Sequence, residues 1–95
     1  MRIFAAVVGF EWDDGNSDKN FTKHKVSSEE CEEAFCDERR VMREDTTHSQ
    51  AEVRHYLIGK TRSGRMLFIS FTIRTHLIRV ISARDINRKE RTYYE

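Results

Sequence analysis

Alternation of apolar and polar positions dominates the second half of the chain. Within residues 66–74 every second side chain is a large aliphatic or aromatic group, which is the period-two pattern of a half-buried strand. Residues 53–59 and 77–84 alternate in the same way. The polar segments 61–64 and 75–76 between them are typical of hairpin turns. The sequence therefore predicts three consecutive antiparallel strands.

The N-terminal part of the chain predicts one further strand and a first helix. Residues 3–12 are rich in β-branched and aromatic side chains, as strands are. Either Asn16 or Ser17 can cap a short helix that runs to about His24. Because Lys and His residues fall in its last turn, this predicted helix also complements the helix dipole.

A second helix is predicted from a capping signal. Ser27 and Glu30 have the spacing of a capping box, in which each side chain accepts a bond from the other residue's amide. Cys31, Ala34 and Phe35 then form one narrow apolar stripe. Beyond this helix, residues 40–42 are predicted to be extended and residues 44–51 to form a polar loop.

These elements together predict an α+β fold in a single domain that spans residues 1–95. The two N-terminal helices are expected to pack on one face of an antiparallel sheet, whose other face is partly open. A short C-terminal helix, capped by Asp85, is expected to end the chain. The length of 95 residues leaves room for one small domain only.

Composition narrows the class of protein. Hydrophobic residues make up 38% of the chain, below the usual share of about 45–50%, so a thin core is expected. No apolar run approaches the roughly 18 residues of a spanning helix. The apolar residues 1–10 lack a signal-peptide cleavage site, and a cytoplasmic protein is predicted. Cys31 and Cys36 have neither disulfide nor metal-site spacing.

The charge is divided unequally between the two halves. Residues 1–50 contain seven Lys/Arg and twelve Asp/Glu, a net charge of −5, whereas residues 51–95 contain ten and four, a net charge of +6. A small domain polarised in this way has one face that attracts polyanions. The alternative is that strands simply carry arginines on a solvated face.

A set of basic residues on the predicted sheet suggests chemistry on RNA phosphodiesters. Strict alternation places Arg79 with Ile81 and Ala83 on one face of the last strand and Arg84 on the other. Arg54 begins an earlier strand, just after Glu52. Arginine side chains match phosphate oxygens in bidentate fashion, and a carboxylate or a crowded lysine such as Lys23 can carry a proton. Surface arginines on a solvated sheet remain the alternative interpretation.

Other site classes are not predicted. His48, His55 and His76 have no metal-ligand spacing, so no metal and no other cofactor is expected. The sequence contains no Gly-rich phosphate loop, no nucleophile elbow and no HExxH motif. The absence of these motifs excludes a nucleotide-hydrolysing P-loop enzyme, a serine hydrolase and a zinc protease.

Several short motifs make the chain similar to a known family. They are the run Phe10-Glu-Trp-Asp13, Lys23-His24 ahead of Val26-Ser27, Glu52-Val-Arg54, Gly64-Arg65, Arg79-Val-Ile-Ser-Ala-Arg84, and Glu90-Arg91 with Tyr94. In this order and spacing they resemble the BrnT family of toxins. The resemblance covers residues 10–95. One departure is Lys25, which stands where the family usually has glycine.

The resemblance implies a RelE-like ribonuclease fold and a toxin of a bacterial type II toxin–antitoxin pair that cleaves mRNA and arrests translation. It also implies a BrnA-like ribbon-helix-helix antitoxin, which would bind operator DNA together with the toxin and repress the shared operon. The motif positions fall on Lys23, His24, Glu52, Arg54, Arg79 and Arg84.

We assign roles to these positions as hypotheses. Arg79 and Arg84 are expected to stabilise the phosphate and the transition state, Arg54 to act as a second clamp, and Lys23 or Glu52 to carry the proton. Further RNA contacts are expected from His24, Arg65 and Arg74.

Two functions follow from this interpretation. The first is a metal-independent endoribonuclease that cleaves mRNA. The second is a non-catalytic module whose basic sheet binds the antitoxin or operator DNA. The two hypotheses differ in one observable property, since the second would bind nucleic acid with a steep salt dependence and leave RNA uncut.

Overall fold

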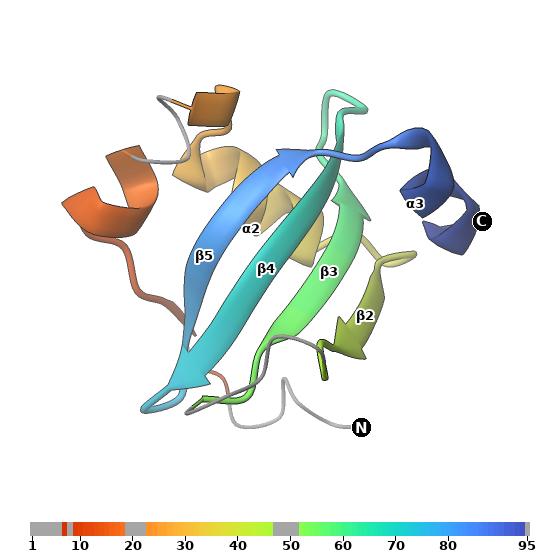
Figure 1. Cartoon of the computed structure of the whole chain (residues 1–95). Helices are drawn as coiled ribbons and strands as arrows, with labels where there is room; N and C mark the ends of the chain where they lie inside the picture. Colours follow the sequence, from red (N-terminus) through yellow and green to blue (C-terminus); the bar gives the residue numbers. More distant parts are fainter. Residues whose placement is uncertain (1–6, 8, 19–22, 47–51, 95) are drawn as a thin grey trace.

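The computed structural model describes residues 7, 9–18, 23–46 and 52–94 (Figure 1). Five strands form one mixed sheet in the order β1-β5-β4-β3-β2. Their bounds are Gly9–Phe10 for β1, Val41–Glu44 for β2, His55–Lys60 for β3, Met66–Arg74 for β4 and Leu77–Asp85 for β5. Strands β2 to β5 pair antiparallel with their neighbours. The three strands predicted from alternation are thereby confirmed, with ends that differ by one or two residues.

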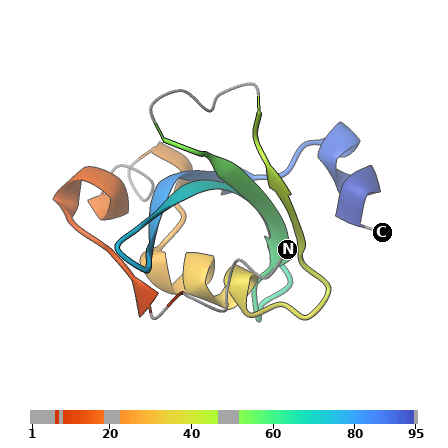
Figure 2. The ribbon, with the colours of Figure 1, turned by 90° about the horizontal axis from the view of Figure 1, so that it is seen from below.

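One helix covers one face of this sheet. Helix α2, Ser28–Phe35, lies within the curve of the sheet, and helix α3, Arg88–Tyr94, lies outside that curve (Figure 2). Ser27 caps α2 by the predicted capping box: its hydroxyl accepts from the Glu30 amide at 3.1 Å, and the Glu30 carboxylate accepts from the Ser27 amide at 3.0 Å. The helices of the described part of the chain are too short or too polar to cross a membrane.

The core lies between α2 and the sheet. The predicted stripe on α2 is buried, and it meets the inward side chains of β3, β4 and β5. Three aromatic rings join the sheet edge to its centre, because Phe35 makes edge-on contacts with Phe10 at 5.2 Å and with Phe71 at 5.0 Å between ring centroids. The rings supply much of the apolar area that so small a core can bury.

The helix can approach the sheet closely only because β3 carries a glycine there. A Cβ atom at Gly59 would clash with the carbonyl oxygen of Ala34 in α2. Helix and sheet backbones are therefore in direct contact at this point. This contact fixes the depth at which α2 sits in the curve of the sheet.

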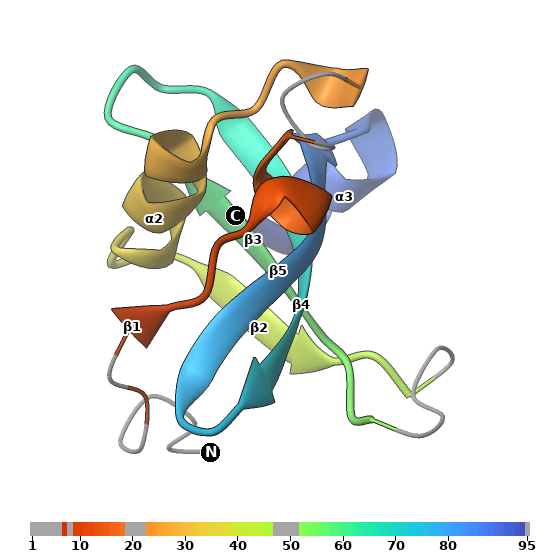
Figure 3. The same cartoon turned by 90° about the vertical axis from the view of Figure 1, so that its left-hand side faces the viewer.

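The predicted N-terminal half is partly wrong. In the part of the chain that the structure describes, no pair of N-terminal helices packs on the sheet. Instead, Asp14–Asp18 form a π-helical turn, η2, which lies beside β5 (Figure 3). Residues 23–24 are helical, and residues 19–22 lie outside the described part. Asn16 lies inside this turn and does not cap a helix. The turn is too short to offer an apolar face, so among the described elements α2 is the helix that covers this face of the sheet.

Strand β1 also differs from expectation. Of the predicted strand over residues 3–12, the structure has Gly9–Phe10 as strand, and residues 1–6 and 8 lie outside the described part. The strand pairs parallel with β5. The sheet is therefore mixed and not purely antiparallel.

The C-terminal helix begins later than predicted. Asp85 is the last residue of β5 and caps no helix. The cap of α3 is Asn87, whose side chain accepts from the Glu90 amide at 2.8 Å while Glu90 accepts from the Asn87 amide at 3.0 Å. Asp85 instead binds Arg65, and that pairing holds it at the end of the strand.

An irregularity in β5 corrects the predicted faces of that strand. Ser70 of β4 pairs with Ser82, whereas the next residue, Phe71, pairs with Val80. Ile81 is therefore one residue extra, a β-bulge that shifts the alternation by one position. The prediction that Arg79 and Arg84 lie on opposite faces is wrong. Both lie on the face opposite α2, together with Phe68 and Thr72.

The backbone at Lys25 is strained. Its φ of 58° lies in the left-handed region, which favours glycine and costs other residues about 1–2 kcal/mol. Lys25 thus adopts a backbone conformation that suits the glycine expected at this position. The carbonyl of Lys25 accepts a bond from Arg65 at 2.7 Å, which helps to hold it.

We expect Lys25→Gly to raise the free energy of unfolding by about 0.5–1 kcal/mol, because relief of the strain exceeds the added chain entropy of glycine. Urea unfolding of both proteins measures the change. Lys23→Gly is the control: it lies two residues earlier in a helical segment, and there glycine should destabilise. Equal stability of Lys25→Gly and the original protein would contradict the expectation.

Candidate functional site

The arginines predicted to act on RNA are separated into groups, and most are paired with carboxylates. The first group, here called the Arg79 cluster, consists of Arg74, Arg79, Glu52, Asp13 and Glu11. Arg79 donates from Nη1 and Nη2 to the two carboxylate oxygens of Asp13 at 2.9 and 3.3 Å, and its Nη1 lies 3.5 Å from Glu11. Arg74 binds Glu52 through Nε and Nη2 at 2.6 and 2.7 Å.

A folded loop holds Asp13 in front of Arg79. The backbone amide of Asp13 donates to the side chain of Asn16 at 2.8 Å, and the Asn16 amide donates back to Asp13 Oδ1 at 3.1 Å. Asn16 is only 3% exposed and also donates to the carbonyl of Glu11 at 3.0 Å. Trp12 Nε1 donates to Glu32 of α2 at 2.7 Å, so the loop is fastened to the helix as well.

The segment that carries Glu52 and Arg54 is held by the neighbouring strand. The buried hydroxyl of Thr72 donates to the carbonyl of Val53 at 3.0 Å, and Thr72 lies directly across from Arg79 in the sheet. Glu52 is thereby placed beside the arginines of the cluster. The hydrogen bond from Arg74 lowers the pKa of Glu52, and the charges of Arg54 and Arg79 lower it further.

Asp13 and Arg79 favour the charged form of each other. The hydrogen bond between Asp13 and Arg79 lowers the pKa of Asp13. The same bond raises the pKa of Arg79. The side chain of Arg79 is 21% exposed, so its stem is covered while its fork remains near solvent. A planar guanidinium that already holds two carboxylate oxygens has the geometry to hold two phosphate oxygens.

Arg84 lies in a second group farther along β5. It binds Glu90 of α3 through two bonds of 2.9 and 2.7 Å, and its guanidinium lies 4.5 Å from the centroid of the Phe68 ring. Arg79 and Arg84 are about 15 Å apart along the strand, since strands rise about 3.3 Å per residue. They therefore share a face but cannot bind the same phosphate.

Arg65 lies in a third group, on the side of α2. Its guanidinium donates to Asp85, to Glu30 and to the carbonyls of His24 and Lys25, at distances between 2.7 and 3.2 Å. These bonds tie the end of the first helical segment, the start of α2 and the end of β5 to one side chain. The geometry favours a structural function for Arg65, and its predicted contact with RNA stays a prediction.

We expect the Arg65 group to make folding sensitive to acid. The hydrogen bond from Arg65 lowers the pKa of Asp85. Burial alone would raise the pKa of Glu30, but the hydrogen bonds from the Ser27 amide and from Arg65 bring it below its ordinary value of 4.5. A depressed folded-state pKa adds stability that is present above the unfolded pKa and is lost as the pH falls through the folded one. Arg65→Met should thus destabilise strongly at pH 7 and less at pH 3. Urea unfolding at both pH values measures this, and an equal loss at both would contradict it.

The structure brings together four of the predicted residues and separates the others. Glu52, Arg54, Arg74 and Arg79 are near one another. Arg84 is on the same face but apart, and the backbone of His24 and the exposed Lys23 belong to the Arg65 side. Sequence reasoning missed Asp13, Glu11 and Glu90 as partners of arginines. Asp13 and Glu11 stand in the conspicuous Phe10–Asp13 run, which was the available signal.

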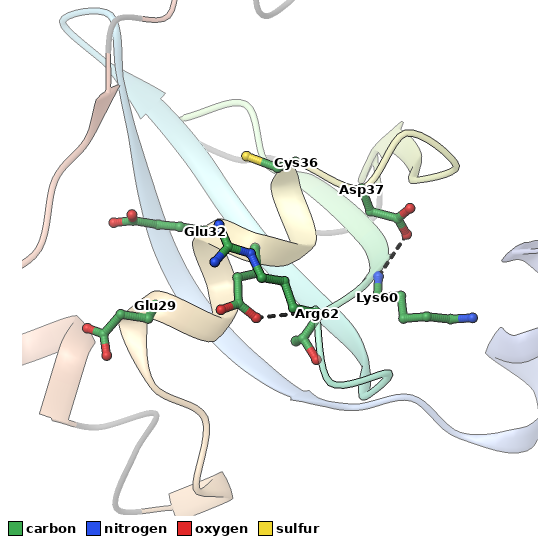
Figure 4. A pocket seen from close by; sticks show the side chains of 8 residues that line it. Glu29, Glu32, Cys36, Asp37, Lys60 and Arg62 are labelled. Atoms are coloured by element: carbon green, nitrogen blue, oxygen red, sulfur yellow. Dashed lines mark hydrogen bonds between the residues drawn. The ribbon is translucent and has the colours of Figure 1, made fainter.

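A well-formed cavity of the described residues does not lie at these arginines. It measures about 470 Å³ and lies between α2 and the turn after β3, lined by Glu29, Glu32, Glu33, Cys36, Asp37, Lys60, Thr61 and Arg62 (Figure 4). Its carboxylates would repel a polyanion, so it is unsuited to RNA. Within the residues that the structure describes, no three His, Cys, Asp or Glu side chains are grouped to hold a metal ion.

Comparison with known families identifies the chain. The model of a family described as the ribonuclease toxin, BrnT, of type II toxin–antitoxin systems matches residues 12–90. The chain belongs to the BrnT family. No curated protein matches it. The match begins beside Asp13 and ends at Glu90, and so includes every arginine of the three groups.

Membership of the BrnT family relates the arginines on the sheet to a class of substrate. A ribonuclease toxin acts on RNA and is paired with an antitoxin. Arginine side chains held on one sheet face, with a carboxylate among them, are suited to a phosphodiester substrate. The resemblance inferred from short motifs is thus confirmed at the level of the family.

Proposed function

We propose that this BrnT protein is an endoribonuclease that cleaves mRNA without a metal ion and thereby arrests translation. The observation that carries the proposal is the bidentate holding of two carboxylates by Arg79 and Arg74 on one face, with Arg54 nearby. These forks supply positive charge where a scissile phosphate would accumulate negative charge. Stabilisation of this kind is usually the largest catalytic effect.

RNA cleavage of this type needs three actions. The ribose 2′-hydroxyl loses a proton and attacks the adjacent phosphorus, the 5′-oxygen leaves and takes up a proton, and a 2′,3′-cyclic phosphate remains. Arg79 and Arg74 would hold the non-bridging oxygens of the phosphate. Glu52 would accept the proton of the 2′-hydroxyl once RNA has displaced it from Arg74, because loss of the hydrogen bond that lowers its pKa makes it a stronger base.

The remaining predicted residues would bind RNA on either side of the cleaved bond or offer another proton carrier. Arg54 would clamp the same phosphate or the next one, and Arg84 would hold the strand about 15 Å farther along β5. Lys23 is the alternative proton carrier, and His24 and Arg65 would contact RNA from the α2 side. The antitoxin is proposed to be a BrnA-like ribbon-helix-helix protein that represses the shared operon together with the toxin in the cytoplasm.

A gel assay tests the proposal. Purified toxin free of antitoxin is incubated with labelled single-stranded RNA in the presence of a chelator, beside Arg74→Ala. We expect cyclic-phosphate ends from the original protein and slower cutting by the variant. A contaminating nuclease would cut equally in both preparations, which would count against the proposal.

A second arm covers dependence on the ribosome. If purified RNA stays intact, the same two proteins are added to a translating extract. Cutting of mRNA there by the original protein alone supports the proposal with the ribosome as a required component. Intact RNA in both assays, with salt-sensitive binding, would overturn it in favour of a non-catalytic module that docks an acidic antitoxin or operator DNA.

A further inference from the structure

A groove separates the open face of the sheet from α3. Its floor is formed by Tyr56 of β3 and Phe68 of β4, whose rings stack at 5.1 Å between centroids with an angle of 18°. Its walls are lined by Asp45, Asn87, Lys89, Glu90 and Tyr93, and its volume is about 390 Å³. Stacked in this way, the two rings turn their faces towards each other and present mainly their edges to the groove, and the rim carries charges of both signs.

An aromatic ring is exposed on the α3 side of this groove. Tyr93 on α3 is 51% exposed, and Val53 is the other large hydrophobic side chain of the described residues with so much exposure. Helix α3 has no buried residue. It is held by polar contacts, namely the Arg84–Glu90 pair and the Tyr94 hydroxyl, which donates to Asp37 at 2.6 Å. The groove is therefore not closed by apolar packing.

The groove continues the face that carries the Arg79 cluster. Phe68 pairs across the sheet with Arg84, as Thr72 pairs with Arg79. The guanidinium of Arg84 lies over the Phe68 ring at the edge of the groove. A strand of RNA that follows β5 from Arg79 towards Arg84 would reach the groove with one of its bases.

We propose that the groove between Tyr56, Phe68 and Tyr93 binds one nucleobase of the RNA substrate. This inference deepens the proposed function and rests on it. The face of a base can stack on the exposed ring of Tyr93. Lys89 can approach the neighbouring phosphate, and the Asp45 carboxylate can accept from the amino or imino groups of the base. The combination of an exposed aromatic ring with a cation and an anion matches a nucleotide better than an apolar peptide side chain.

Binding of short RNA probes tests the groove without any need for cleavage. The probes are fluorescent single strands with every 2′-hydroxyl methylated, which removes the nucleophile. One series carries an abasic site at each position in turn. Fluorescence anisotropy gives the dissociation constants for the original protein, Tyr93→Ala and the control Tyr93→Phe.

We expect Tyr93→Ala to weaken binding of the intact probe by about 5- to 150-fold, which corresponds to one stacked base. Tyr93→Phe keeps the ring and should bind as the original does. The loss should disappear with the one probe whose abasic site falls at the groove, because the base that Tyr93 would contact is already absent. Tyr56→Leu should show the same pattern.

Salt dependence separates stacking from charge. Tyr93→Ala should leave the slope of log K against log salt unchanged, whereas Lys89→Ala should reduce its magnitude by about 0.7, the value for one phosphate contact on a single strand. Thermal unfolding of each variant confirms that it is folded. Tyr93 is exposed, so its truncation removes no core contact.

Two results would overturn the inference. One is an equal loss for Tyr93→Ala with the intact probe and with every abasic probe, or no loss at all. The other is weaker binding of the antitoxin with unchanged binding of RNA, which would assign the groove to a protein partner. Neither result depends on whether the protein cuts RNA, so a failure here is distinguishable from a failure of the ribonuclease proposal.

Discussion

RNA cleavage by Arg79→Ala should be slower than that of the original protein by about 10²–10³-fold, the effect of removing one well-placed donor from a charge-stabilising site. The position of Arg79 is closely controlled. Its partner Asp13 is bound to the buried Asn16, and Thr72 lies opposite it in the sheet. Arg79→Lys should recover little activity, because lysine keeps the charge but cannot make the two parallel bonds. Single-turnover cleavage of a labelled RNA measures the rates.

Two controls make this prediction specific. Arg62→Ala removes the same charge from the acidic cavity beside α2 and should cut RNA at the original rate. Asp13→Asn combined with Arg79→Ala removes the carboxylate that the single variant leaves uncompensated. If the double variant cut RNA as fast as the original protein, Arg79 would serve only to neutralise Asp13, and its proposed role at the phosphate would be wrong.

Gly59→Ala should lower the free energy of unfolding by about 2–4 kcal/mol, because the added methyl group collides with a backbone carbonyl that no rotamer change can move. Helix α2 would have to move out of the curve of the sheet and give up contacts of its buried stripe. In a domain of this size such a loss lowers the Tm by about 10–25 °C. Thermal and urea unfolding measure it.

Gly9→Ala is the matched control for this effect. A Cβ atom at Gly9 would meet only the side chain of Leu77 at 3.6 Å, an ordinary contact. This variant should unfold within about 0.5 kcal/mol of the original protein. If both glycine variants had the same stability as the original, the close approach of α2 to β3 would be contradicted.

Some local signals in the sequence predicted the local structure correctly, whereas the helix caps predicted at Asn16 and Asp85 were wrong. The Ser27–Glu30 box marked the start of α2 because both of its bonds form within one helical turn. Alternation marked β4 over its full length, since one face is buried and the other is not. Each of these elements depends on residues that are close in the sequence, and so a pattern can carry the information.

Features that depend on distant partners were not predictable in this way. Asp13 and Arg79 are 66 positions apart in the chain, and nothing in either segment indicates the other. The parallel pairing of β1 with β5 likewise joins segments that are far apart in the sequence. The identity of the basic residues could be inferred from their types and motifs, but their division into three groups follows from which carboxylates the fold brings to them.

The bulge at Ile81 has a consequence for how the length of the chain can change. Since Ile81 has no partner of its own in β4, deletion of this one residue would join Val80 to Ser82 in uninterrupted register. Ala83 would stay in the core and Arg84 on the open face. Insertion of a second residue beside Ile81 would instead require a wider distortion. Related chains that differ in length can therefore lose a residue at this position and still keep both arginines on one surface, and an alignment gap there would not signal a changed site.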